Sequence, residues 1–254
     1  MTFDPAKEFP EPRTHVTNPS ITAIMHTVGG HQDKIVRAIQ SFREQTYQNT
    51  ILFVVNSHPD RLIIHGKPPN VVVHNTRDVF TKPLQLYAYS LKRIITDCWT
   101  ILDDDDWISP KHIEQLVGVW NDAESRSSKP LQVCVPHAFG VYDDGVKPLD
   151  FQGWCNSLFE RVTPEEVDYI YARFPADRIC GLDTWIANNS YFDQRKSTGN
   201  RTYHWDRTGP NHVSSHETLH ESHGERARFE IAKRYWKYKL WAHEQPLAEI
   251  TLGH

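Results

Sequence analysis

The chain has 254 residues, of which 39% are hydrophobic and 24% are charged, and this composition is ordinary for a globular protein rather than a disordered one. A net charge of −4 disfavours a broad nucleic-acid-binding surface. The four cysteines lack Cys-x-x-Cys spacing, so neither a zinc ribbon nor a dense disulfide framework is indicated. No apolar stretch reaches signal-peptide or transmembrane length, and we therefore expect a cytoplasmic protein without a membrane span.

The first 120 residues alternate between strand-like and helix-like patterns. Residues 1–20 carry four prolines and little apolar periodicity, so we expect an irregular arm there. After it, short apolar runs predict strands and apolar residues at helical spacing predict the helices between them. The predicted strands are 21–25, 51–55, 71–73 and 99–102, and the predicted helices lie after the first, third and fourth strands. This alternation favours right-handed crossovers and a mostly parallel central sheet flanked by helices.

Two further observations concern the loop after the first predicted strand and the helix before the fourth. The loop after the first strand contains Gly29-Gly30, which lets the backbone approach a ligand closely. It does not match Gly-x-Gly-x-x-Gly, so a dinucleotide-binding fold is not supported. The helix that begins at Lys82-Pro83 is predicted to bury a face that extends to Ile95.

Four consecutive carboxylates, Asp103 to Asp106, follow the fourth predicted strand directly. The next helix is predicted to have Ser109 as its N-cap and Pro110 at its first position. The run therefore lies at the carboxyl end of a central strand, where open α/β sheets bind ligands. Adjacent carboxylates repel one another, and Mg²⁺ or Mn²⁺ would compensate them. The alternative is a solvated acidic turn that caps the helix.

Residues 101–107, Ile-Leu-Asp-Asp-Asp-Asp-Trp, resemble the Asp-x-Asp motif of GT-A nucleotide-sugar glycosyltransferases, a family with many bacterial and phage members. The upstream order agrees with this resemblance. Residues 21–27 resemble the family's first strand, residues 45–49 its Gln-Thr-Tyr-Pro-Asn turn, and residues 51–55 its second strand. The resemblance covers residues 21–120 and becomes thin afterwards.

The resemblance implies roles for several residues at the carboxyl ends of these strands. Asp103 and Asp105 would flank a Mn²⁺ or Mg²⁺ ion and the donor, with Asp104 also on the donor. Thr27 and Val28, next to His26, fall where the family contacts the nucleotide. Asn56 stands where the family commonly has an aspartate that reads the base, so the base of the donor is left open. Lys82 is a candidate phosphate contact, and the alternative for it is an exposed lysine.

The second half of the chain continues the α/β pattern. Residues 131–135 predict a strand, and Asp143-Asp144-Gly145 predicts a turn between extended segments. Residues 163–166, Thr-Pro-Glu-Glu, form a capping-box pattern that opens a helix. Asp183 falls where many inverting GT-A enzymes carry an acidic pair that supplies the general base, although Leu182 replaces the first acid. A helix cap is the alternative role for Asp183.

A histidine-rich stretch, residues 204–223, offers both a metal ligand and a rival function. GT-A enzymes often complete the metal shell with a late histidine, and His212 and His216 are our candidates. The sequence His216-Glu217-Thr218-Leu219-His220 also matches the zincin pattern His-Glu-x-x-His, with Glu217 as the base of a zinc peptidase. The stretch lacks the apolar face that a zincin helix buries, which favours an accidental match.

The domain organisation that follows is an arm (1–20), a GT-A domain (21–224, with a nucleotide half to 120 and an acceptor half from 121) and a C-terminal extension (225–254). The extension mixes cations with aromatic residues and is predicted to be a helix that packs on the domain or binds a membrane, a glycan, a nucleic-acid strand or a partner.

We therefore expect a metal-dependent glycosyltransferase that uses a nucleoside-diphosphate sugar, with UDP as the expected carrier. The acceptor is left open among a glycan, a lipid-linked molecule, a protein and a modified DNA base. The alternatives are the zinc peptidase and a non-catalytic sugar- or nucleotide-binding module. The sequence does not determine the oligomeric state.

Overall fold

The computed structural model describes residues 13–77, 83–123, 129–150, 154–173, 192–197, 199–206, 208, 237 and 239–252. Its elements in chain order are β1 (Ile21–Thr27), α2 (Gln32–Arg43), β2 (Thr50–Asn56), β3 (Ile64–His65), β4 (Val71–Asn75), α3 (Pro83–Leu91), β5 (Cys98–Ile101), β6 (Trp107–Ile108), α4 (His112–Asn121), β7 (Leu131–Cys134), β8 (Ala138–Tyr142), β9 (Gly145–Leu149), the 3₁₀ turn η1 (Trp154–Asn156), β10 (Ser157–Glu160), α5 (Pro164–Arg173), β11 (Asp193–Lys196), β12 (Tyr203–Asp206) and β13 (Ile250–Thr251).

A seven-stranded sheet with the order β11-β7-β10-β5-β1-β2-β4 forms the centre of the fold. Strand β1 pairs in parallel with β2 and β5, and β2 pairs in parallel with β4. Strand β10 is antiparallel to both of its neighbours, β5 and β7. The mostly parallel sheet predicted from the sequence is therefore confirmed, and the carboxyl ends of β1, β2 and β5 lie at one edge.

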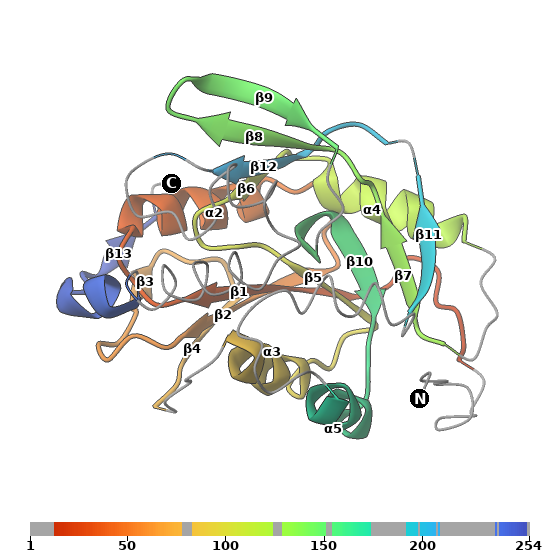
Figure 1. The fold of residues 1–254 in the computed structure, drawn as a ribbon, viewed down its shortest axis with the longest axis horizontal. Coiled ribbons are helices and arrows are strands. Elements are labelled where there is room, and N and C mark those ends of the chain that lie inside the picture. The colour runs from red at the N-terminus through yellow and green to blue at the C-terminus, as the bar shows by residue number, and fades with distance from the viewer. Residues whose placement is uncertain are drawn as a thin grey trace.

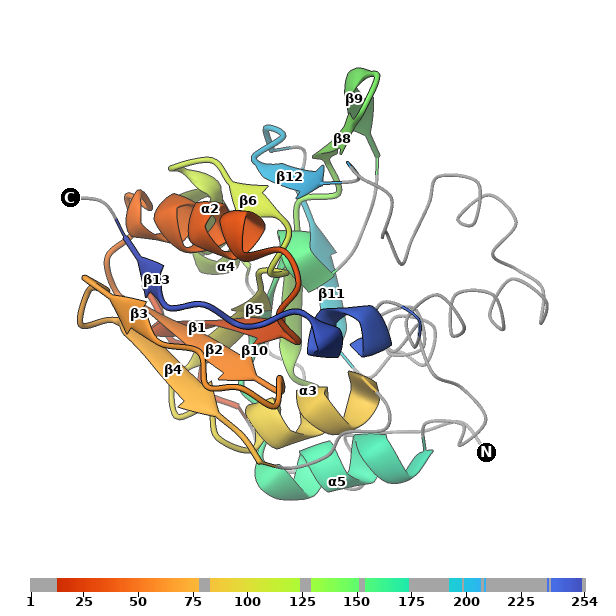
Figure 2. The same cartoon turned by 90° about the vertical axis from the view of Figure 1, so that its left-hand side faces the viewer.

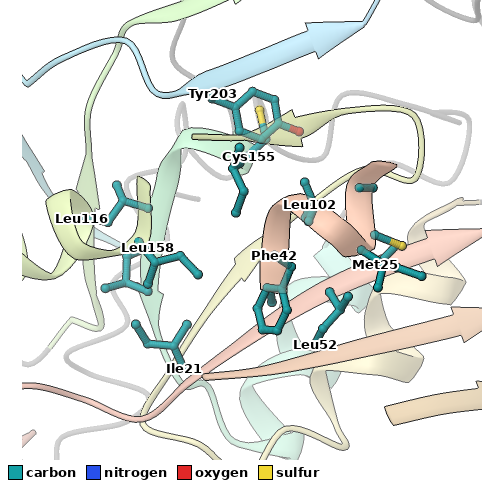
Figure 3. Packing of buried hydrophobic residues seen from close by; sticks show 14 of the residues in the cluster. Ile21, Met25, Phe42, Leu52, Leu102, Leu116, Cys155, Leu158 and Tyr203 are labelled. Carbon is teal, nitrogen blue, oxygen red and sulfur yellow. The ribbon is translucent and has the colours of Figure 1, made fainter. Parts of the chain in front are cut away.

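Helices cover both faces of this sheet, with α2 and α4 on one side and α3 and α5 on the other (Figures 1 and 2). Successive side chains of β1 alternate between the two cores, as a strand period of two residues requires. Ile21 and Met25 join Phe42 of α2 in one core (Figure 3), whereas Ile24 joins Trp99 in the other. The uninterrupted apolar runs of β1 and β2 thus reflect burial on both faces.

A second, four-stranded sheet with the order β6-β12-β8-β9 lies beside α2 and α4 (Figure 1). Its strand β6 follows the acidic run immediately, and β12 is antiparallel to β6 and parallel to β8. The predicted turn at Asp143-Asp144-Gly145 closes the hairpin of β8 and β9, and Gly145 has φ of +128° there. The small sheet brings the end of β12 next to the acidic run.

The starts of two helices differ in how well the sequence predicted them. The capping box of α5 is confirmed, because the backbone N–H of Thr163 donates to Glu166 Oε2 (2.7 Å) and that of Glu166 donates to Thr163 Oγ1 (3.2 Å). The predicted start of α4 is wrong, since the helix begins at His112 with Lys111 at the N-cap position, so Ser109 is not the N-cap and Pro110 is not the first helical residue. Gln45, a buried residue that follows α2, caps the start of this helix instead. Its Oε1 accepts the N–H of Ile113 at 3.1 Å.

Two further segments depart from the sequence prediction or add to it. Helix α3 ends at Leu91, so Ile95 is 82% exposed rather than part of the buried face. Residues 239–244 are helical, and β13 pairs in parallel with β3, which the sequence did not indicate. Ala242 O accepts a hydrogen bond from His58 Nε2 at 3.2 Å, so the described part of the C-terminal extension packs on the domain. None of the helices that the structure describes combines the length and apolar character needed to cross a bilayer.

Candidate active site at the carboxyl edge of the sheet

The acidic turn, which we define as Asp103 to Asp106, follows β5 at the edge where β1 and β2 also end. Its start is fixed to the sheet because Leu102 N donates to Ile24 O at 3.0 Å. The N–H of Asp106 donates to Asp103 O at 3.2 Å and closes the turn. Asp103, Asp104 and Asp105 are partly exposed, whereas Asp106 is fully buried. The four acids therefore lie in two different environments.

The acidic turn concentrates negative charge. Although the residue is partly exposed, desolvation of its carboxyl group and the charge of Asp105 hold the pKa of Asp104 well above its usual range, and a hydrogen bond from Thr27 opposes the shift. Burial and the charges of Asp105 and Asp103 likewise raise the pKa of Asp106. A divalent cation held by the carboxylates of Asp103 and Asp105 would relieve this repulsion, and oxygen ligands suit Mn²⁺ and Mg²⁺. The donor set therefore fits the expected metal.

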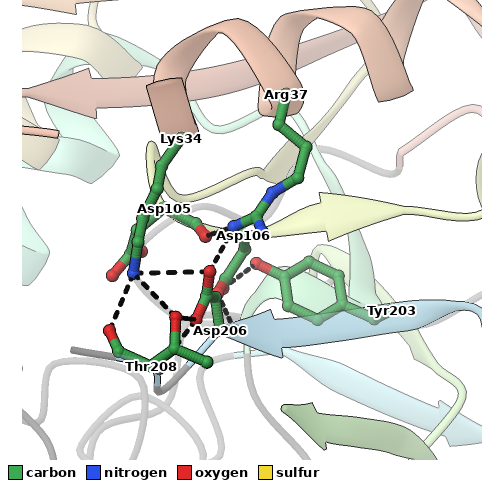
Figure 4. Close-up of polar contacts among 7 residues, drawn as sticks. All are labelled: Lys34, Arg37, Asp105, Asp106, Tyr203, Asp206 and Thr208. Carbon is green, nitrogen blue, oxygen red and sulfur yellow. Dashed lines mark hydrogen bonds and ion pairs between the residues drawn. The ribbon is translucent and has the colours of Figure 1, made fainter. Parts of the chain in front are cut away.

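Two cations of α2 lie beside the acidic turn and bind an aspartate from another part of the chain (Figure 4). Arg37 forms an ion pair with Asp206, the last residue of the small-sheet strand β12, and Arg37 Nη2 also donates to Asp105 O at 2.7 Å. Lys34 Nζ lies 3.3 Å from Asp206 Oδ2 and donates to Thr208 O at 3.0 Å. Burial would raise the pKa of Asp206, but hydrogen bonds from Arg37 and Thr208 and the charge of Lys34 outweigh it and lower the pKa to about 2.

Asp106 connects the acidic turn to the same strand. Its Oδ2 accepts the hydroxyl of Tyr203 at 2.5 Å, and its Oδ1 accepts the backbone N–H of Asp206 at 2.7 Å. His112 packs its ring against Tyr203 with 5.6 Å between the ring centroids. We call Asp106, His112, Tyr203 and Asp206 the buried polar layer, because each is at most 3% exposed.

No sequence pattern singles out Arg37, Tyr203 or Asp206, and none gives Asp106 a role separate from the rest of the acidic run. Arg37 and Asp206 are 169 residues apart in the chain, and Tyr203 and Asp106 are 97 apart. No local pattern joins residues at such separations. The only sequence signal was the number of acids in the turn, since two of the four are enough for an Asp-x-Asp motif.

Comparison with known proteins identifies the architecture. Neither a protein-family model nor a curated protein sequence matches the chain. Among solved structures, residues 1–349 of S. aureus TarS in complex with UDP-GlcNAc superpose with a TM-score of 0.57 and 14% identity, over 86% of this chain and 73% of that chain. The mannosyltransferase PcManGT from Pyrobaculum calidifontis, in complex with GDP-Man and Mn²⁺, gives 0.50 and 13% over 94% and 77% of the two chains. Both are nucleotide-sugar glycosyltransferases.

The chain has the GT-A fold. The GT-A fold expected from the acidic motif is thus confirmed. In its central sheet, β10 runs antiparallel to its neighbours and the other strands are parallel. A longer TarS chain is matched over only 36% of its length, so this chain corresponds to about a third of it.

Within this GT-A fold, the loop after β1 lies against the acidic turn. Thr27 is buried, and its hydroxyl accepts the N–H of Gly29 at 3.1 Å and bonds the carboxylate of Asp104. Val28 is also buried. Gly29 has φ of +79°, and a Cβ there would lie 2.8 Å from the ring of His58, so a side chain is excluded. The loop therefore contributes its backbone and the Thr27 hydroxyl to this edge.

Two other sequence candidates near this edge have partners in the fold. Asn56 is fully buried; its Nδ2 donates to Asp60 O (2.9 Å) and Asn75 Oδ1 (2.8 Å), and its Oδ1 accepts the N–H of His58 at 3.1 Å. His26 lies within β1 rather than in the loop, and its Nε2 bonds Ser90 Oγ of α3 at 2.8 Å. Burial lowers the pKa of His26 to about 3, so it is neutral at physiological pH.

The remaining sequence candidates lie outside the described residues. They are Lys82, Asp183, His212 and His216, together with Glu217 and His220 of the zincin match. Within the part of the chain that the structure describes, no group of three or more His, Cys, Asp or Glu residues is placed to hold a metal ion.

Proposed function

We propose that this protein is a metal-dependent glycosyltransferase that transfers a sugar from a nucleoside-diphosphate sugar to an acceptor hydroxyl. The observation that carries the proposal is the acidic turn at the carboxyl edge of a GT-A sheet, with three partly exposed carboxylates ahead of one that is buried. The resemblance to structures that hold UDP-GlcNAc or GDP-Man with Mn²⁺ supports a nucleotide-sugar donor. We favour UDP as the carrier and Mn²⁺ or Mg²⁺ as the metal.

Asp103 and Asp105 would hold the metal, with His212 or His216 as a third ligand. When bound, the metal supplies positive charge to the leaving diphosphate. Proximity in the chain supports His212, because Thr208 is fixed beside Asp206 by hydrogen bonds of 2.7 and 2.8 Å and only three residues separate it from His212.

The remaining roles concern the donor and the acceptor. We assign the nucleotide sugar to Thr27 and Val28 of the first loop, to Asp104, and to Asn56 and Lys82. Thr27 is the best supported of these, because it links the first loop to Asp104. Asp183 is the proposed general base that takes the proton of the acceptor hydroxyl. A glycan, a lipid-linked molecule, a protein and a modified DNA base are the acceptor classes to be tested.

The release of nucleoside diphosphate from a panel of UDP-, GDP- and TDP-sugars tests this proposal, because many transferases hydrolyse their donor slowly without acceptor. We expect Mn²⁺-dependent release from one donor class and none in EDTA. A zinc peptidase, which the GT-A fold does not favour, would instead cleave peptides and lose that activity in Glu217→Gln. A non-catalytic module would bind one nucleotide sugar without hydrolysing it. Failure to bind any member of the panel would refute the proposal.

A further inference from the structure

The acidic turn is held from two sides by groups outside it, through the backbone of Asp105 on one side and the carboxylate of Asp106 on the other. On the α2 side, Arg37 Nη2 donates to Asp105 O at 2.7 Å while its guanidinium lies over the ring of Trp107, 4.1 Å from the centroid. On the β12 side, the hydroxyl of Tyr203 and the N–H of Asp206 donate to the two oxygens of Asp106. These bonds fix the carbonyl group of Asp105 and the side chain of the residue that follows it.

The same contacts converge on Asp206. Its Oδ2 binds Arg37 and Lys34, and its Oδ1 accepts the N–H and the hydroxyl of Thr208 at 2.8 and 2.7 Å (Figure 4). Asp206 thus ties α2, the acidic turn and Thr208 into one unit. The carboxylate of Asp206 is buried, and both of its oxygens are occupied by these bonds. It therefore influences the acidic turn through the residues that it binds.

We propose that Tyr203, Asp206 and Arg37 are positioning residues that hold the acidic turn in the geometry needed to bind a divalent cation through Asp103 and Asp105. This inference rests on the proposed function, since it concerns the same metal. Residues that orient metal ligands without touching the metal usually contribute a factor of about 10 to 100 in affinity. The proposal predicts a loss of that size when only the positioning contacts are removed.

Two substitutions remove these contacts without a change in net charge, and so avoid a direct electrostatic effect on cation binding. Tyr203→Phe deletes the hydroxyl that bonds Asp106. Arg37→Lys keeps a positive charge but replaces the planar guanidinium, which bonds both Asp105 O and Asp206, with an ammonium on a flexible stem. Arg37 has a side chain that is 39% exposed, so its replacement is also the safer variant for folding.

Tyr47→Phe is the matched control, because it deletes a tyrosine hydroxyl that donates to Pro19 O at 2.8 Å, away from the acidic turn. Mn²⁺ affinity of the full chain without donor is measured by titration calorimetry, with thermal unfolding to confirm that each variant is folded. We expect Mn²⁺ to bind about 10-fold or more weakly to Tyr203→Phe and Arg37→Lys, and within about two-fold of wild type to Tyr47→Phe.

The outcomes separate this inference from the proposed function. If the wild type binds Mn²⁺ and Asp105→Ala does not, while Tyr203→Phe and Arg37→Lys bind like wild type, the positioning role is refuted and the metal site stands. If the wild type binds no Mn²⁺, or binds it equally well after Asp105→Ala, the metal proposal and the positioning role fall together. If Tyr203→Phe is unfolded, Arg37→Lys alone decides.

Discussion

The acidic turn and the buried polar layer next to it contain the same kind of side chain in opposite settings. Asp103 to Asp105 are partly exposed at the carboxyl edge of the sheet, where their charges repel one another. Asp106, one residue further, is fully buried and receives two hydrogen bonds from β12. Burial and hydrogen bonding therefore separate Asp106 from its three neighbours. We propose that Asp103 to Asp105 face the substrates and that Asp106 holds the turn in place.

Asp105→Ala should give the largest effect and should leave stability nearly unchanged. Removal of one group that stabilises developing charge costs about 10²–10³-fold in rate, so Mn²⁺-dependent donor hydrolysis should fall by at least that factor. Asp105 is partly exposed, and the midpoint of urea unfolding should stay close to that of wild type. If Asp105→Ala kept full activity or unfolded at a much lower urea concentration, the proposed difference in role between the exposed aspartates and buried Asp106 would be wrong.

Asp206→Ala should show the reverse pattern, with stability as the main loss. The carboxylate is buried and pairs with Arg37 and Lys34, and breaking such a pair leaves cations without their partner. Loss of one member of a buried ion pair costs about 3–5 kcal/mol, and the exposure of Arg37 places the expected loss near the lower limit. Urea unfolding followed by tryptophan fluorescence measures it, with Asp103→Ala as the comparison that should lose less than about 1 kcal/mol.

The buried polar layer should also make the fold sensitive to acid through His112. Its Nε2 donates to Cys155 O at 3.2 Å, and its Nδ1 accepts the hydroxyl of Thr202 at 2.9 Å, so the imidazole is held neutral. Burial lowers the pKa of His112 to about 4. The unfolded chain, with a histidine pKa near 6.5, binds more protons between about pH 6.5 and 4, so stability falls as pH falls through this window.

A loss of about 2 kcal/mol from this group is expected by pH 5, since one pKa unit corresponds to about 1.4 kcal/mol. Urea unfolding at pH 7 and pH 5 measures the loss. His112→Asn should remove this part of the loss, and the part that comes from buried His26, whose pKa burial also lowers, should remain. An unchanged pH dependence in His112→Asn would show that other groups cause it.

The smallest expected effect concerns the start of α4, the helix that comes after the acidic turn and begins with His112 of the buried polar layer. Gln45→Ala removes the acceptor of the Ile113 N–H and two donations of 2.9 Å, to Ser41 O and Ser109 O. Ser109→Ala removes one bond of 3.0 Å between Oγ and His204 Nε2. Gln45→Ala should therefore destabilise the protein by about 1 kcal/mol more than Ser109→Ala. The opposite ranking in urea unfolding would favour the sequence-based assignment of Ser109 as the cap.

The sequence by itself determined the elements whose cause is local. The apolar runs of β1, β2 and β5 predict strands covered on both faces, and the capping box of α5 needs residues only three apart, Thr163 and Glu166. The place of the acidic turn after a central strand follows from the same patterns, because a strand and the residues after it are continuous in the chain. Together with the resemblance that the acidic motif carries, these features predicted the GT-A architecture, which is confirmed, whereas the roles of Asp103 and Asp105 stay predictions.

Only the tertiary structure decided which polar groups support the site. Gln45 bonds Ile113 across 68 residues, and Asp106 bonds Tyr203 across 97. Arg37 of α2 bonds Asp206 of β12 across 169 residues. Periodicity records which face of an element is apolar, but it carries no information on which buried polar groups will be close enough to bond. That choice belongs to the packed fold, since a buried donor or acceptor must find its partner there.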